Sequence, residues 1–386
     1  MIKKEVLQAV CIMIGFIIGA GILAIPFVVA QAGFWTGMFM IIIIGLIMMT
    51  VNLYVGEVNL RTRLNHQLTG LTNIYLGKVG WGFMLFSMVL GMYGALTAYT
   101  IEQGTFLKAL LAPIIGGHQI IYSIIFFIIF GFIVYIGINW IKKSEIFMVF
   151  FIVIILGVVA VFAAPHIEPG NLTGFRFSNL LIPFGVVLFA FLGTASIPEV
   201  RAELSHNRKS MKKTIIIGSV IPIIIYAVFA LLVVGVTGIA TTESAMLGLK
   251  QFLGYKAVVF GLLFGILTMA TSFIAVGLAL KEMYMFDFGL KSKKAAALTL
   301  AVPLVAGFTI ILLNINNAFY SVLNIAGALA GGIDIILIVL MHWASKEKSE
   351  REPEYSVPKS RILGIIIIFV AVAGMAYVIL QTLGII

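Results

Sequence analysis

The feature that most constrains this sequence is a series of apolar runs, each of about twenty residues or more, the length of helix that crosses a bilayer. The runs do not alternate between apolar and polar residues as the strands of a membrane barrel do. The chain is 62% hydrophobic and 10% charged, a balance that water-soluble domains do not have. We therefore predict an all-α integral membrane protein that crosses the cell membrane many times.

Eleven runs of this kind follow one another along the 386 residues. We expect membrane helices at about 6–30, 35–60, 80–109, 119–140, 145–164, 179–204, 212–238, 256–281, 294–313, 318–342 and 360–384. Short polar connections separate these helices, and none of the connections has the length of a soluble domain.

The positions of Lys and Arg predict how the chain lies in the membrane, because cytoplasmic loops carry an excess of these residues. With a cytoplasmic N-terminus, 21 of the 25 Lys and Arg residues lie on the inner side. The outer side then holds Lys108, Arg176, Lys250 and Lys256. We expect the N-terminus inside and the C-terminus outside. The net charge of +10 then reflects membrane topology and not a nucleic-acid-binding surface.

The first apolar run contains a break in its pattern. Residues 15–26 read GFIIGAGILAIP, with Gly19, Ala20 and Gly21 near the middle of the membrane. Glycine has no Cβ, so the backbone turns there at little cost. Lipid cannot satisfy the N–H and C=O groups that a turn frees, so the break must be buried in protein or line a polar cavity. A cavity of that kind is a place to bind a solute.

A second break ends the sixth run, where residues 189–200 read FAFLGTASIPEV. Small residues are followed by Pro198, which has no backbone donor. The two breaks lie five helices apart, so the helices that carry them cross the membrane in opposite directions. Interrupted segments at corresponding positions of two halves indicate the binding site of a transporter. The alternative is that the small residues serve only close helix packing.

The stretch GFIIGAGILAIPFVVAQAGF resembles the first-helix signature of the amino acid/polyamine/organocation superfamily, most closely its amino acid/auxin and aromatic amino acid (tyrosine/tryptophan/serine) permease branches. LGTASIPEV with the basic loop and TIIIGSVIPIIIY, and then TMATSFIAVGLALKEMYMFDF at 268–288, agree with it. The resemblance covers essentially the whole chain. It implies a LeuT-type fold of two inverted five-helix repeats, 1–164 and 179–342, with helices 1 and 6 broken and an eleventh helix at 360–384. It also implies coupled uptake of amino acids by alternating access.

For a zwitterionic amino acid, the resemblance places the substrate backbone in the two breaks. The N-terminus of a half-helix attracts a carboxylate. We therefore expect the backbone N–H groups of Ala20, Gly21 and Ile22 to bind the carboxylate of the substrate. The ammonium group is expected to bind carbonyls near Ile17 and Ile18 and around the second break. The binding residues predicted in this way are Ile17, Ile18, Gly19, Ala20, Gly21 and Ile22, with Phe191, Gly193, Thr194, Ala195 and Ser196.

Tyr93 and Thr97 of the third helix lie near the middle of the membrane. Members of the resembled fold often use an aromatic or hydroxyl residue there beside the carboxylate, although a tyrosine packed within a helix bundle is equally compatible with the pattern. The side-chain pocket is expected to take a neutral side chain, with a preference for a hydrophobic one. This expectation rests on Phe189, Phe191, Ile197 and Phe273.

The resemblance also implies a sodium site, and sodium is the coupling ion that we favour. The matching groups are the carbonyls of Gly15, Ile18 and Thr268 and the hydroxyls of Thr271 and Ser272. The alternative is that these hydroxyls only bond to their own helix. Some proton-coupled relatives place a lysine of helix five at this position, whereas Lys142 and Lys143 stand at the inner end of that helix. Proton coupling stays open, because several permeases of the aromatic branch are regarded as proton-coupled.

Ionisable residues within membrane spans are functional hypotheses. Glu102 is a candidate for an outer gate or for carrying a proton. Glu199 is followed by Arg201, which predicts a salt bridge at an inner gate. Asp334 lies deep enough within its membrane span that its carboxyl needs a polar partner. Glu57 is expected to pair with a cytoplasmic arginine.

Other classes of function find little support in the sequence. Cys11 is the only cysteine, and no pair among the five histidines has metal-ligand spacing, so we expect no transition-metal site. No nucleophile, acid/base pair or cofactor motif indicates an enzyme, and no charged ring or filter motif indicates a channel. An amino acid sensor would need a longer soluble tail or loop. The prediction is therefore an ion-coupled amino acid symporter, with Na⁺ or H⁺ in place of any cofactor; a proton-coupled permease or an exchanger is the alternative.

Overall fold

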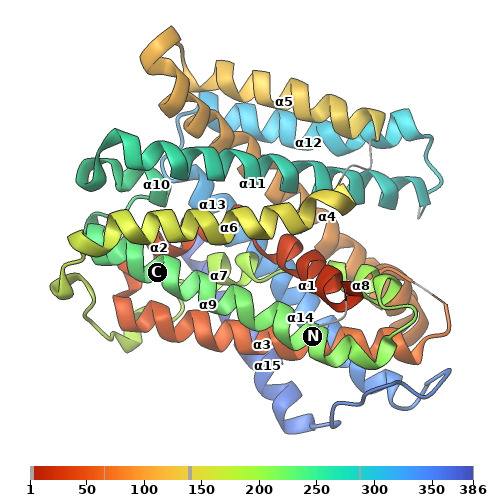
Figure 1. Cartoon of the computed structure of the whole chain (residues 1–386). Helices are drawn as coiled ribbons and strands as arrows, with labels where there is room; N and C mark the ends of the chain where they lie inside the picture. Colours follow the sequence, from red (N-terminus) through yellow and green to blue (C-terminus); the bar gives the residue numbers. More distant parts are fainter. Residues whose placement is uncertain (1–3, 65, 138–140, 287, 386) are drawn as a thin grey trace.

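A computed structural model describes residues 4–64, 66–137, 141–286 and 288–385 of the protein, although the side chains of 141–148, 255–258 and 286 are not described. These residues form a bundle of helices that run side by side (Figure 1). The helices are α1 Lys4–Ile17, α2 Gly21–Ala32, α3 Phe34–Arg61, α4 Leu68–Ile115, α5 Gln119–Ile136, α6 Ile141–Ala163, α7 Phe184–Ala190, α8 Ile197–Glu203, α9 Met211–Thr237, α10 Ala245–Gly248, α11 Lys250–Phe286, α12 Ser292–Leu312, α13 Ala318–Ala326, α14 Gly332–Ser345 and α15 Arg361–Thr382.

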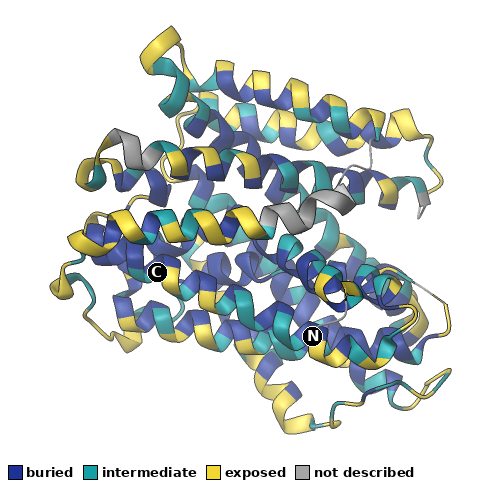
Figure 2. Ribbon diagram, viewed as in Figure 1, coloured by how far each residue is buried: buried dark blue, intermediate teal, exposed yellow. Residues whose placement is uncertain are grey.

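The expected number of membrane spans agrees with the structure. Among the residues described, ten helical spans are long and apolar enough to cross a membrane, and the pair α1 and α2, bent by 57°, raises the number to eleven. The span that contains α7 and α8 and the span that contains α13 and α14 are the most buried. In Figure 2, exposed residues gather on the outer helices such as α5, α6 and α15. Their exposed side chains are largely Ile, Phe and Val, as a surface in contact with lipid requires.

The loops divide the bundle into two ends. One end, which we call the basic end, carries the connections 62–67, 204–210 and 346–360, and the other, the opposite end, carries 116–118, 164–183 and 238–244. Lys142 and Lys143, expected at the inner end of the fifth span, have side chains outside the described part of the chain.

Two buried cations at the basic end bind the ends of helices. Arg201 of α8 donates to the carbonyl of Thr62 at 2.8 Å and to the side chain of Asn59 at 2.7 Å. Lys281 of α11 donates to the carbonyls of Val134 and Tyr135 at 3.1 and 2.8 Å. The last carbonyls of a helix have no partner within it and carry its negative dipole end, so a cation satisfies both needs. Arg201 therefore fixes α8 to the end of α3, and Lys281 fixes α11 to the end of α5.

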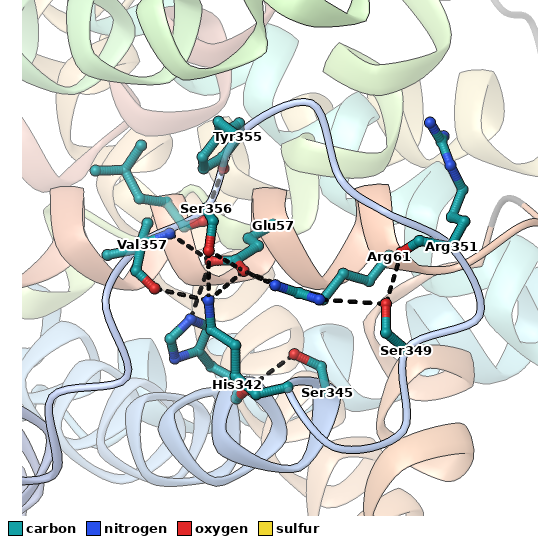
Figure 3. Close-up of polar contacts among 11 residues, drawn as sticks. Glu57, Arg61, His342, Ser345, Ser349, Arg351, Tyr355, Ser356 and Val357 are labelled. Atoms are coloured by element: carbon teal, nitrogen blue, oxygen red, sulfur yellow. Dashed lines mark hydrogen bonds and ion pairs between the residues drawn. The ribbon is translucent and has the colours of Figure 1, made fainter.

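The carboxylate of Glu57 organises the rest of the basic end, and we call its contacts the Glu57 cluster (Figure 3). Its side chain is fully buried and pairs with Arg61 at 2.7 Å, as the sequence predicted. Lys346 also donates to it, the Nε2 atom of His342 lies 3.1 Å away, and the backbone N–H of Val357 donates at 2.7 Å. The cluster thus joins α3, α14 and the connection that leads to α15.

We predict that Glu57→Gln destabilises the protein, because it leaves buried cationic groups without their carboxylate. Breaking a buried ion pair in this way costs about 3–5 kcal/mol, and the loss is measured as a lower midpoint in thermal unfolding. The matched control is Glu347→Gln, which removes an exposed pair with Lys359 at 2.6 Å. Lys359 lowers the pKa of Glu347, but solvent screens this pair. Equal midpoints for the two variants would contradict the role of the Glu57 cluster.

Candidate functional site

A cavity of about 130 Å³ lies between the two broken helices. Both breaks line it, together with one face of α4, part of α11, and the turn that joins α13 to α14. The predicted site residues in its lining are Ile17, Gly19, Gly21, Thr194, Ala195 and Asp334. Of the other predicted residues, Ile18, Ala20, Ile22, Phe191, Gly193 and Ser196 belong to the same two broken segments but lie outside the lining.

The two breaks touch each other through glycines. A Cβ on Gly21 would lie 2.7 Å from the Cα of Ala190, and a Cβ on Gly193 would lie 2.4 Å from the side chain of Ile17. Side chains do not fit at such distances, so each glycine permits the other broken helix to approach. A Cβ on Gly19 would lie 3.2 Å from the Ser272 hydroxyl. The GAG sequence therefore does more than allow a turn, because it also brings the first break against α7 and α11.

A tyrosine of an unbroken helix satisfies the carbonyls at both breaks. The hydroxyl of Tyr226, in α9, lies 2.8 Å from the carbonyl oxygens of Ile17 and of Ala190. These are the last residues of α1 and α7. The side chain is completely buried. Because one hydroxyl has one proton, it donates to the two carbonyls in turn, and Tyr226 links the ends of the two half-helices.

The second break satisfies part of its own backbone. The hydroxyl of Ser196 donates to the carbonyl of Gly193 at 2.6 Å, and the N–H of Ser196 donates to the same oxygen at 3.0 Å. The Ser196 hydroxyl is thus committed to the turn, whereas Thr194 lines the cavity.

Asp334 has the partner that the sequence could not identify. Its Oδ1 atom lies 2.6 Å from the hydroxyl of Ser87, in α4, and that hydroxyl lies 2.7 Å from the carbonyl oxygen of Ala330. Ser87 is completely buried, and all three residues line the cavity. Ala330 belongs to a π-helical turn, Gly327–Gly331, between α13 and α14. Such turns are frequent at functional sites.

Comparison with known proteins identifies the family of the chain. The tryptophan/tyrosine permease family matches residues 2–378. The chain belongs to this family. It is 26% identical to a tyrosine-specific transport system of Haemophilus influenzae, over 93% of the chain and 92% of that protein. It is 25% identical to glutamine transporter 2 of Aliivibrio fischeri, over 88% and 89%, and 24% identical to a tryptophan-specific transport protein of Shigella flexneri, over 94% and 90%.

These matches make the permease an amino acid transporter and not an enzyme. Together with its apolar spans, they make it a multi-pass membrane protein, which in bacteria belongs to the cell membrane. The resemblance seen in the sequence to the aromatic amino acid permeases is confirmed.

The face of α4 that meets the cavity differs from the face predicted. Tyr93 pairs with the hydroxyl of Tyr284 at 2.8 Å and donates to the carbonyl of Leu298 at 3.0 Å, on the side of α11 and α12. Thr97 is buried but does not line the cavity. Tyr99 lines it instead and hydrogen bonds with Ser272. A signal for this face was the series of small residues at four-residue spacing, Ser87, Gly91 and Ala95, which all line the cavity.

The residues of the predicted sodium site are only partly brought together. Ser272 lies beside Gly19 of the first break. The Thr271 hydroxyl donates to the carbonyls of Leu267 and Thr268 in its own helix, at 3.0 and 2.9 Å. The Thr268 hydroxyl likewise donates to Phe264 at 2.9 Å. In this conformation the helix itself uses the Thr271 hydroxyl. Gly15 lies within α1, and the Ile18 N–H donates to Ile14 at 2.8 Å.

A second cavity, of about 150 Å³, continues the first towards the basic end. The two share lining residues, including Phe16, Met88 and Ala279, and the second adds Gln67 from the 62–67 connection and Glu199 from α8. The Arg201 guanidinium, which we expected to form a salt bridge with Glu199, is bound to the end of α3.

The opposite end is closed over the site by buried contacts. Glu102 of α4 accepts a hydrogen bond from Ser244, in the connection before α10. Glu243 accepts from the backbone N–H of Tyr320 at 3.2 Å, and burial raises the pKa of the Glu243 carboxyl. The rings of Phe27 and Tyr320 meet edge to face, with centroids 5.3 Å apart. These contacts tie α2, α4 and α13 together above the breaks.

We predict that Gly21→Ala impairs the permease, because the added methyl group would meet the backbone of α7 and force the breaks apart. Such overpacking costs about 1–3 kcal/mol, so a lower unfolding midpoint is expected together with a loss of substrate binding, measured by ligand-induced thermal stabilisation. Gly82→Ala is the control, since a Cβ on this α4 residue meets nothing within 4 Å. A Gly21→Ala protein as stable and as responsive to substrate as Gly82→Ala would refute the close contact of the breaks.

Proposed function

We propose that the permease is a secondary active transporter, an ion-coupled amino acid symporter that works by alternating access. The observation that carries this proposal is the position of the cavity. It lies between the two breaks, continues into a second cavity towards the basic end, and is covered at the opposite end. Since the distribution of Lys and Arg places the basic end in the cytoplasm, this conformation would be the one that opens inwards.

The proposal includes an inverted repeat of five helices, with the broken spans as the first member of each half. Two glycine kinks support it. Gly77 in α4 has φ 74° and ψ −168°, and Gly254 in α11 has φ 75° and ψ 168°. The distance along the sequence from Gly77 to Gly254 equals the distance from Phe34 to Met211. Phe34 and Met211 are the first residues of α3 and α9. Matching kinks at matching positions are what two copies of one unit would have.

For the substrate, we propose a neutral amino acid with a large apolar or aromatic side chain. Phe16, Met88, Met92, Phe189 and Leu192 contribute to the cavity lining, and the described lining contains no Lys, Arg or His to bind an acidic side chain. An apolar cavity of about 150 Å³ accommodates a benzene ring, and this one has nearly that volume. The backbone groups of the two breaks remain for the carboxylate and the ammonium group.

The test of this proposal is uptake of radiolabelled amino acids into proteoliposomes that contain the purified protein. The panel is L-tyrosine, L-tryptophan and L-glutamine, which the relatives' names suggest, with L-glutamate and L-lysine for comparison. We expect exchange of L-tyrosine or L-tryptophan and none of the charged two. Exchange of L-glutamine alone or of only the charged amino acids would contradict the proposed side chain, and exchange equal to that of protein-free liposomes would contradict transport itself.

For the coupling ion, sodium at Gly15, Ile18, Thr268, Thr271 and Ser272 is one candidate, and a proton is the other. The described hydrogen bonds of the Thr271 hydroxyl stay within α11 and do not reach the first break, which favours the proton. We expect an inward proton gradient, at equal sodium, to drive uptake in the wild type and in Thr271→Ala alike. Uptake driven by a sodium gradient alone, and lost in Thr271→Ala, would instead support the sodium site.

A further inference from the structure

The hydrogen bonds of Ser87 determine where protons lie in the cavity. Its hydroxyl oxygen is 2.6 Å from Oδ1 of Asp334 and 2.7 Å from the carbonyl oxygen of Ala330. A hydroxyl has one proton to donate, and a carbonyl oxygen only accepts. If Ser87 donates to Ala330, the contact with Asp334 needs a proton on the carboxyl. With an ionised Asp334, the one Ser87 proton would be shared between the carboxylate and the Ala330 carbonyl, as the Tyr226 proton is shared between two carbonyls. With a protonated Asp334, each of the two contacts has a proton of its own, so the neutral carboxyl satisfies both acceptors fully.

The surroundings of Asp334 also favour the neutral carboxyl. Its side chain is buried, and the cavity lining described here contains no positively charged residue. From α4, the lining includes Tyr99, and Glu102 stands at the opposite end, bound by Ser244. From α3 come Tyr54 and Glu57, which lie with His342 in the Glu57 cluster, and α15 carries Tyr377. A carboxylate in such a place is costly unless a proton or another cation neutralises it.

We propose that Asp334 carries the coupling proton and that Ser87 couples its charge to the π-helical turn. With the proton bound, Asp334 donates to Ser87 and Ser87 donates to Ala330. When the O–H bond of Asp334 breaks, the proton leaves through the two cavities towards the basic end, and the electron pair stays on the carboxylate. Ser87 then turns its proton to Asp334, and the carbonyl of Ala330 loses its donor.

This loss would reach the substrate site directly. The π-helical turn packs against the second broken span, since a Cβ on Gly327 would lie 2.1 Å from the carbonyl oxygen of Gly185, and one on Gly331 would lie 2.8 Å from the Leu188 side chain. A change in the hydrogen bonding of the turn therefore changes its fit against α7. The inference rests on the proposed function and adds the residue that would make transport depend on protons.

The experiment compares exchange with accumulation for L-tyrosine, L-tryptophan or L-glutamine, whichever the wild type exchanges. Exchange at equal pH on both sides needs binding and reorientation but no net proton movement. Accumulation under an inward gradient of one pH unit, coupled one to one, reaches about tenfold, because one pH unit has the free energy of a tenfold concentration ratio. We expect Asp334→Asn to reach a ratio of internal to external substrate of about one, against about ten for the wild type. It should still exchange, at a rate that no longer changes with pH, since an amide donates to Ser87 as the protonated carboxyl does.

Two further variants keep the test decisive. Ser87→Ala should still exchange substrate but accumulate it only about onefold, because the π-helical turn no longer responds to the charge of Asp334. Ser123→Ala is the matched control: it is another buried serine that donates to a carbonyl, that of Thr100 at 3.0 Å, away from the cavity. It should behave as the wild type.

Three results would overturn the proposal. The first is Asp334→Asn that still accumulates substrate in a proton gradient. The second is Asp334→Asn that binds and exchanges nothing at any pH, which would make Asp334 a ligand of the substrate. The third is Ser87→Ala that accumulates substrate as the wild type does. If the wild type exchanges no amino acid, the proposed transport function itself is contradicted. That outcome differs from the three results above, which concern only the proton site.

Discussion

The structure depends on satisfying backbone groups where helices are broken inside the membrane. Lipid offers no hydrogen bonds, so every freed N–H and C=O needs a partner within the protein or a cavity. Tyr226 binds the carbonyls that end α1 and α7, and Ser196 binds the carbonyl of Gly193. Glycines allow the two breaks to pack closely enough for one tyrosine to reach both. Residues of both breaks line the cavity between them, and a solute with its own charged ends is suited to bind backbone groups there.

The two ends of the bundle are held together by different chemistry. At the basic end, Arg201, Lys281 and the Glu57 cluster bind the ends of α3 and α5 and the connection before α15. None of these three groups belongs to the described lining of the second cavity. At the opposite end, neutral or acidic groups and aromatic rings cover the breaks. Under the proposed alternating-access mechanism, the closure that changes during transport would be the contact between α2 and α13.

Much of the fold could be predicted from the sequence because the membrane imposes it. The lengths of the apolar runs gave the spans, and Gly and Pro marked both breaks. Asp334 was identified as a residue that needs a partner, and Glu57 as one that pairs with an arginine. A polar or charged residue within an apolar run is visible in the sequence whatever its tertiary contacts are, and it needs a partner in the membrane.

The orientation of each helix about its own axis could not be predicted in the same way. In α4 every face is apolar, so the pattern did not distinguish the face of Tyr93, which meets Tyr284, from the face of Tyr99, which meets the cavity. Tyr226 was missed because nothing in an unbroken apolar helix marks a tyrosine that binds two distant carbonyls. In α11, packing decides which of the neighbours Thr271 and Ser272 meets the first break, and it is Ser272.

The most direct test of the account is whether substrate occupies the cavity between the breaks. Ala279 lines both cavities from α11, so Ala279→Cys in a Cys11→Ser background gives one thiol on the proposed route. The measurement is its rate of modification by a water-soluble maleimide, with and without saturating L-tyrosine, L-tryptophan or L-glutamine. The account predicts that the thiol reacts and that at least one of the three slows the reaction. A thiol that reacts at the same rate with all of them, in a protein that still exchanges amino acids, would place the substrate elsewhere and contradict the account.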